Sequence, residues 1–86
     1  MTSHLDGNVL AGPLFEVFRT DMTTARSECA SCHDRSMLAL AMVYDLAPGW
    51  TVRCHVCGAE LMTLVRTPAG LRIDLRGLSS LDVPAS

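Results

Sequence analysis

The sequence contains no lysine, and its seven arginines are outnumbered by nine acidic residues, which gives a formal net charge of −2. Proteins that bind nucleic acids without sequence preference need a clustered excess of cations to displace counterions. The arginines are instead scattered along the chain: Arg19, Arg26, Arg35, Arg53, Arg66, Arg72 and Arg76. We therefore do not expect nucleic acid to be the partner of this protein.

Long apolar runs are also missing. No stretch reaches the ~20 apolar residues that a membrane-spanning helix needs, so we expect no membrane segment. Met1–Gly7 has no cationic region followed by an apolar run, so no signal peptide is expected. We therefore expect a cytoplasmic protein. In such a reducing compartment disulfides are rare, and paired thiols more often hold a metal ion.

Aromatic residues make up only 5% of the 86 residues, although apolar residues as a whole make up 49%. A chain of this size buries roughly 60–65% of the surface of its unfolded state, so a hydrophobic core alone leaves a small margin of stability. Small domains commonly add a disulfide, a metal ion or a partner subunit. We expect a single domain over residues 6–82, with a flexible N-terminus at 1–5 and a tail at 83–86.

All four cysteines occur in two Cys-x-x-Cys pairs, Cys29 with Cys32 and Cys54 with Cys57. A two-residue spacer lets both sulfurs of a pair turn inward on one tight loop, here called a knuckle. Two facing knuckles form a tetrahedral site of four sulfurs, which is the preferred geometry of structural zinc. The 21 residues between the pairs lie just beyond the ~15–20 residues that are usual for this pattern. The sequence therefore predicts one Zn²⁺ held by the four thiolates.

The residues that follow the two pairs differ. Gly58 follows Cys57 at a point where a knuckle commonly needs a positive φ, which glycine adopts without steric cost. The equivalent residue after Cys32 is His33, which fits that conformation less well. We expect His33 and His55 to be solvated or hydrogen-bonded, and not to be metal ligands.

Other uses of the same cysteines remain open. Two disulfides would need an oxidising compartment. Cys29–His33 matches the string that attaches c-type haem, but this needs export and leaves the second pair unexplained. A redox dithiol would need one pair to open a helix in a βαβ unit, which the sequence lacks. Iron is the strongest rival to zinc, because rubredoxins hold it in the same geometry and Cys54–Gly58 resembles one of their knuckles.

The N-terminal part has a helical pattern. Asp6 or Asn8 can cap a short helix, and apolar residues follow at mostly helical spacing from Val9 to Phe18. Pro13 suits the first turn of a helix and not its interior. We expect either two short helical pieces or one helix that begins at Pro13.

Residues 37–46, between the cysteine pairs, are almost wholly apolar. Their length allows a strand or a helix. The strand is favoured because Pro48–Gly49 would then turn the chain into a second strand at Trp50–Arg53. Thr20–Glu28 is expected to form a loop and then a short strand that leads to the first knuckle.

The C-terminal part predicts a β-hairpin. In Leu71–Arg76, leucine or isoleucine alternates with a charged residue, which places the apolar side chains on one face of a strand. Pro68–Gly70 would connect this strand to Glu60–Thr67, and Gly77–Leu81 would extend it after a bulge. Together the elements predict a small α+β zinc ribbon, an antiparallel sheet with two knuckles plus a short N-terminal helical segment.

The sequence offers no catalytic set: no Ser/His/Asp triad, paired carboxylates or glycine loop for phosphate can be assembled. With four protein ligands, the metal would keep no open position for Lewis-acid catalysis. We expect no enzyme activity, but a binding module that docks on a protein partner. A nucleic-acid-binding zinc ribbon is an alternative that the net charge of −2 disfavours. Val9–Phe18 is the candidate contact with that partner or with a second copy in a homodimer. Alternatively, this segment is a helix that covers one face of the sheet.

A longer sequence pattern covers most of the chain. It consists of the two knuckles and four further segments: His4–Leu14, Glu16–Phe18, Leu64–Pro68 and Asp74–Leu78. This pattern resembles an uncharacterised family of short actinobacterial proteins, a domain of unknown function, from His4 to about Leu81. The resemblance implies an accessory role, with an oxidoreductase as the partner, and it implies no activity of its own. It also implies a zinc ribbon whose ligands are Cys29, Cys32, Cys54 and Cys57.

Overall fold

Eight strands, one α-helix and three short 3-10 helices lie in residues 4–85, the part of the chain that this computed structural model describes. Residues 1–3 of the predicted flexible N-terminus lie outside the described residues, whereas Leu5 belongs to a strand. In chain order the elements are β1 (Leu5–Asp6), η1 (Gly7–Leu10), α1 (Ala11–Phe18), η2 (Met22–Thr24), β2 (Arg26–Cys29), β3 (Arg35–Met37), η3 (Leu38–Leu40), β4 (Met42–Leu46), β5 (Gly49–Arg53), β6 (Glu60–Thr67), β7 (Gly70–Asp74) and β8 (Leu78–Asp82).

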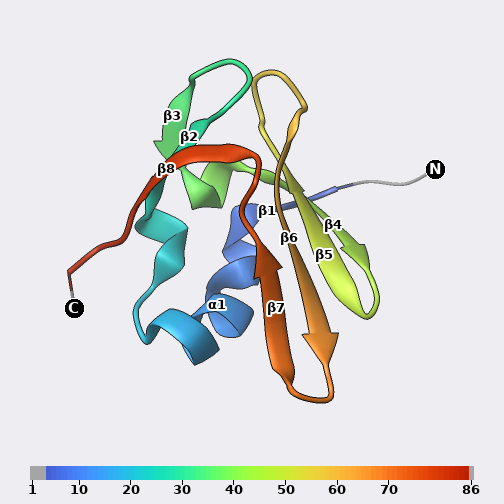
Figure 1. The fold of residues 1–86 in the computed structure, drawn as a ribbon. Helices are drawn as coiled ribbons and strands as arrows, with labels where there is room; N and C mark the ends of the chain where they lie inside the picture. Colours follow the sequence, from blue (N-terminus) through green and yellow to red (C-terminus); the bar gives the residue numbers. More distant parts are fainter. Residues whose placement is uncertain (1–3, 86) are drawn as a thin grey trace.

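The strands form two sheets (Figure 1). The larger sheet has the strand order β1-β4-β5-β6-β7, and the smaller has the order β3-β2-β8. Every neighbouring pair of strands is antiparallel. The chain is therefore a small α+β protein with antiparallel sheets, as the sequence predicts.

The N-terminal segment forms two consecutive helical pieces. The Asp6 side chain caps η1 by accepting a hydrogen bond of 3.0 Å from the Asn8 N–H. Pro13 lies in the first turn of α1, where the missing N–H breaks no helical hydrogen bond. The helix ends at Arg19, whose left-handed conformation (φ 59°) lets its N–H donate to the Phe15 carbonyl at 2.9 Å. The prediction of two short helical pieces is confirmed.

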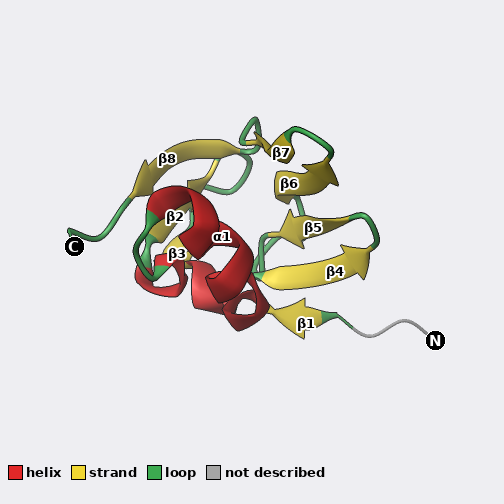
Figure 2. Cartoon of the chain, turned by 90° about the horizontal axis from the view of Figure 1, so that it is seen from below, coloured by secondary structure: helices red, strands yellow, loops and turns green. Residues whose placement is uncertain are grey.

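The helical segment lies on one side of the larger sheet (Figure 2). Leu10 of η1 and Leu14 of α1 are buried in one core with Val43, Val52 and Leu64 of the sheet. In the described part of the chain, every buried side-chain nitrogen or oxygen atom has a hydrogen-bond partner. The buried side chains of residues 9–18 therefore cover one face of the sheet. This is the alternative role that the sequence predicts for the segment.

An ion pair fastens α1 to β6. The Arg66 guanidinium donates to the Glu16 carboxylate at 2.9 Å, and this hydrogen bond and charge lower the pKa of Glu16 below its usual range. The guanidinium carbon also lies 5.6 Å from the centroid of the Trp50 ring, a distance suited to a cation–π contact. Arg66 thus links the helix to two strands of the sheet.

The prediction of one strand over residues 37–46 is wrong. Only Met42–Leu46 forms β4, because η3 interrupts the apolar run and carries the chain from the smaller sheet to the larger one. The turn is fixed by two hydrogen bonds: the Leu38 N–H donates to the Ala25 carbonyl at 2.9 Å, and the Ala41 N–H donates to the Leu38 carbonyl at 3.0 Å. Leu38 is buried in the turn, whereas Leu40 and Leu46 of the same run are exposed, so only part of the run belongs to the core.

The two predicted hairpins are present, but the chain after the second one differs. β4 and β5 pair around Pro48, and β6 and β7 pair around Pro68–Ala69. Leu78–Asp82, expected to extend β7, instead forms β8 and pairs with β2 in the smaller sheet. β7 ends at Asp74, whose carboxylate accepts a hydrogen bond of 3.0 Å from the Arg76 N–H and closes a turn. That turn sends the chain across to the first knuckle.

Candidate metal centre

The two knuckles have the same backbone hydrogen bonds. In the first, the Cys29 N–H donates to the Asp34 carbonyl at 3.0 Å, and the His33 N–H donates to the Cys29 carbonyl at 2.9 Å. In the second, the Cys54 N–H donates to the Ala59 carbonyl at 2.8 Å, and the Gly58 N–H to the Cys54 carbonyl at 2.9 Å. The first knuckle follows β2 and the second follows β5, so each sheet contributes one.

A residue with positive φ completes each knuckle. Gly58 has φ 77°, which confirms the reason given for a glycine at this position. His33 has φ 65° at the equivalent position, although a residue with a Cβ atom adopts this conformation only at some cost. The His33 imidazole lies 3.6 Å from the Glu28 carboxylate. His33 thus takes the conformation that the sequence led us to expect of a glycine.

The structure brings the four predicted ligands together. Their sulfur atoms all lie within 4.8 Å of one another. The Sγ atoms of Cys29 and Cys57 are 3.7 Å apart, and so are those of Cys32 and Cys54. A tetrahedron with zinc–sulfur bonds of ~2.3 Å has edges of about 3.8 Å. A disulfide needs about 2.05 Å between sulfurs, so the spacing suits a metal ion and not two disulfides.

Backbone N–H groups point at the sulfurs of the second knuckle. The Val56 N–H lies 3.4 Å from the Cys54 Sγ, and the Ala59 N–H lies 3.4 Å from the Cys57 Sγ. Such donors stabilise a thiolate relative to a thiol, and only a thiolate binds a metal ion. Each sulfur of the second knuckle therefore has one backbone N–H donor.

The pKa values of Cys29 and Cys32 depend on the surrounding thiols. Burial alone would raise the pKa of Cys29, but N–H groups of Cys32 and Ser31 and the neighbouring thiols hold it at about 7. Near Cys32 an N–H of Asp34 favours the thiolate, but burial and the other sulfurs outweigh it and raise the pKa of Cys32 to about 12. All four sulfurs could be thiolates at this spacing only if a cation neutralised them, because four negative charges would otherwise repel one another.

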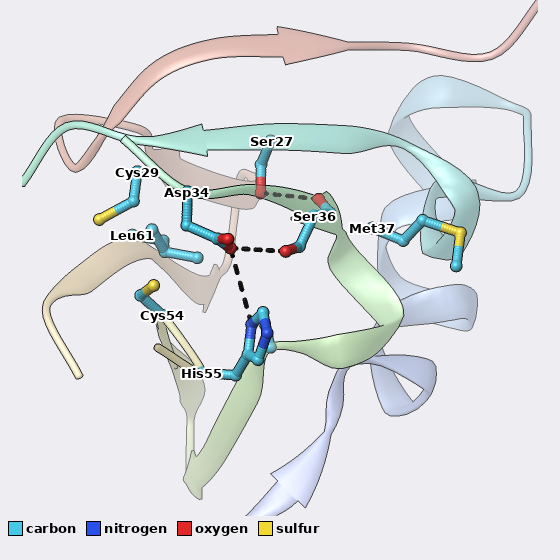
Figure 3. Close-up of a pocket in the computed structure, with 9 residues that line it drawn as sticks. Ser27, Cys29, Asp34, Ser36, Met37, Cys54, His55 and Leu61 are labelled. Atoms are coloured by element: carbon cyan, nitrogen blue, oxygen red, sulfur yellow. Dashed lines mark hydrogen bonds and ion pairs between the residues drawn. The ribbon is translucent and has the colours of Figure 1, made fainter. Parts of the chain in front are cut away.

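Asp34, Ser36 and His55 form a polar cluster beside the sulfurs (Figure 3). The sequence did not predict this cluster. The Asp34 carboxylate accepts a hydrogen bond of 2.5 Å from the Ser36 hydroxyl and lies 3.9 Å from the His55 Nδ1. Asp34 follows the first knuckle and His55 lies on the second, so this contact joins the two. The His55 side chain is 36% exposed and too far from Asp34 for a hydrogen bond. No residue spacing could have indicated that these two side chains are neighbours.

Gly77 was also missed as a structural residue of the site. Its carbonyl accepts a hydrogen bond of 3.0 Å from the Ala30 N–H of the first knuckle, and its N–H donates to the Leu61 carbonyl of β6 at 3.1 Å. Gly77 therefore connects the first knuckle to the larger sheet. The one signal in the sequence is the glycine itself, directly after the alternating strand pattern.

Comparison with known proteins places the chain in a family. The model of DUF6510, described as a family of unknown function, matches residues 1–86, which is the whole chain. The chain belongs to this family. No curated protein and no solved structure matches it. The resemblance to an uncharacterised family is thus confirmed at that level, and for this DUF6510 protein the site itself is the guide to function.

No helix in residues 4–85 has the length and apolar character that crossing a membrane requires.

The four cysteines differ in exposure. Cys29 and Cys54 are buried, Cys32 is half-buried and Cys57 is exposed. The sulfur cluster therefore lies at the rim of the core and not at its centre. A metal ion there would be shielded by both sheets and would touch the surface only beside Cys57.

Proposed function

We propose that Cys29, Cys32, Cys54 and Cys57 hold one structural Zn²⁺ and that the fold around them is a zinc ribbon. On this proposal the protein is a non-enzymatic cytoplasmic module that binds a protein partner. The observation that carries the proposal is the clustering of the four sulfurs within 4.8 Å, with two sulfur pairs at 3.7 Å, close to the edge of a zinc–thiolate tetrahedron. The two knuckles with matching hydrogen bonds support it, because each one presents its pair of sulfurs in the same way.

The bound ion would supply charge neutralisation and a covalent link between the two sheets. All four positions of a tetrahedral ion would be filled by cysteine, so substrate could not reach the metal. The chain's own contribution is to hold the sulfurs at this spacing, through the turns at His33 and Gly58 and the bridge at Gly77. The proposed role of the site is thus to stabilise the fold.

The metal proposal is tested by elemental analysis of protein purified without added metal, together with its visible spectrum. We expect one equivalent of zinc per chain and a colourless sample. Replacing Zn²⁺ with Co²⁺ should give the absorption of a tetrahedral thiolate site. One equivalent of iron in a red sample that bleaches on reduction, found also in protein from native cells, would overturn the zinc assignment in favour of a rubredoxin-like electron carrier.

Exposed apolar side chains on α1 support a protein partner. The Phe15 and Val17 side chains are 49% and 47% exposed, although the same helix buries Leu14. We propose this surface as the contact, and an oxidoreductase as the class of partner.

A photo-crosslinking amino acid in place of Phe15 is expected to capture one defined protein in cells. The same group in place of Leu46, which is exposed on β4, is the matched control. Absence of a specific adduct at Phe15 would contradict the proposed contact.

A further inference from the structure

β7 forms one end of the larger sheet. Its one neighbour in the strand order of the described residues is β6, and Figure 2 shows it at the end of the row of five strands. A strand at a sheet edge leaves N–H and C=O groups free to pair with another chain, and proteins usually protect such edges. No bulge interrupts β7, and it contains no proline. Its free edge therefore needs an explanation.

The hairpin geometry determines which backbone groups of β7 are free. Thr67 pairs with Gly70 and closes a loop of two residues, so these two residues form a hydrogen-bonded pair. Hydrogen-bonded pairs alternate along an antiparallel ladder, so Arg72 and Asp74 also direct their backbone groups toward β6. The backbone groups of Leu71 and Ile73 then point away from the sheet. Another strand could therefore pair with β7 at Ile73.

The charges on β7 complement those of a second β7 strand in one register. If two copies pair antiparallel around Ile73, Arg72 of each lies opposite Asp74 of the other, and opposite charges at such positions stabilise a sheet. Pairing around Arg72 would place two arginines opposite each other, and pairing around Asp74 would do the same with two carboxylates. Charge and backbone hydrogen bonding thus select the same register.

The apolar residues agree with this register. Ile73 would lie opposite Ile73 of the second copy, and Leu71 opposite Leu75. Leu71 and Ile73 already pack against the core of their own chain, whereas Leu75 just beyond the strand is 40% exposed. Pairing would cover Leu75 and continue the core along the joined sheets.

We propose that two copies of this chain associate through antiparallel pairing of their β7 strands around Ile73, so that the two larger sheets become one continuous sheet. Two Arg72–Asp74 pairs would form between the copies, in addition to the Asp74–Arg76 ion pair within each chain, and each copy contributes two outward-facing backbone positions. This dimer does not depend on which metal the cysteines would hold, because the pairing uses the edge of the larger sheet and no cysteine. It also leaves the exposed face of α1 free for another protein.

The test measures the mass of the metal-loaded, full-length chain by analytical ultracentrifugation over a range of concentrations. The unmodified protein should approach the mass of two chains as its concentration rises. Arg72→Glu and Asp74→Lys should each weaken self-association by roughly tenfold or more, because like charges then oppose each other at two symmetric positions. An equimolar mixture of the two variants should form the dimer again, since each variant supplies the charges that the other lacks.

Leu75→Arg provides a second test that leaves the Asp74 turn intact, in case Asp74→Lys does not fold. It should weaken the dimer as well, whereas the matched control Leu46→Arg, at a 63% exposed position on β4, should not. A strictly monomeric unmodified protein would overturn the proposal. So would a dimer that Arg72→Glu and Leu75→Arg leave unchanged, which would place self-association elsewhere, for example at Phe15 and Val17 of α1.

Discussion

Replacing Cys57 by serine is expected to unfold the domain, although this is the most exposed of the four cysteines. Structural zinc sites in small domains contribute apparent free energies of ~10–16 kcal/mol, as much as the whole stability of ~5–15 kcal/mol of a typical domain. An exposed cysteine without a metal would contribute little to packing, and its loss would change stability by about 0.5 kcal/mol or less. A structural metal site and a cysteine without a metal therefore predict opposite effects of this substitution on stability.

The measurement is the ¹H–¹⁵N NMR spectrum, which should lose its dispersion in Cys57→Ser and in the unmodified protein after treatment with a strong chelator. Ser31→Ala is the matched control, because Ser31 is an exposed knuckle residue that is not one of the four sulfur ligands. It should keep both the metal and the native spectrum. A Cys57→Ser variant that is folded and as stable as the unmodified protein would contradict a structural role for the metal.

Gly77→Ala is expected to cost at least about 3 kcal/mol of stability, because it places an atom where there is no room. A Cβ atom at residue 77 would lie 1.9 Å from the Glu60 carbonyl oxygen and 2.7 Å from the Leu61 Cα. Both are backbone atoms of β6, so no side chain can rotate to relieve the overlap. The bridge from Ala30 through Gly77 to Leu61 would have to open.

Chemical denaturation of the zinc-loaded proteins measures this effect, and Gly12→Ala provides the matched control. A Cβ atom at Gly12 would meet no other atom within 4 Å, and the residue lies in α1. Alanine there should therefore leave stability unchanged or raise it by about 0.5–1 kcal/mol. Equal stabilities of the two variants would show that residue 77 lies farther from β6 than the structure indicates.

Local patterns in the sequence were enough to predict the cysteine cluster and several elements. Spacing alone indicated that Cys29, Cys32, Cys54 and Cys57 come together, because a knuckle is a local turn and each pair needs only four residues. The cap at Asp6 and the β6–β7 hairpin are local in the same sense, since a capping side chain or a two-residue loop is formed by neighbours in the chain.

Contacts between distant residues decided the rest. The apolar run at residues 37–46 could not reveal that η3 would interrupt it, because apolar composition does not distinguish one long strand from a strand broken by a short turn. Nor could local pattern place β8 beside β2 or bring Asp34 close to His55, since these pairings depend on how the two sheets are arranged. The sequence by itself determined which sulfurs lie together and where several local turns occur. The tertiary structure decided which strands became neighbours, because strand pairing is a non-local choice that the hydrophobic pattern leaves open.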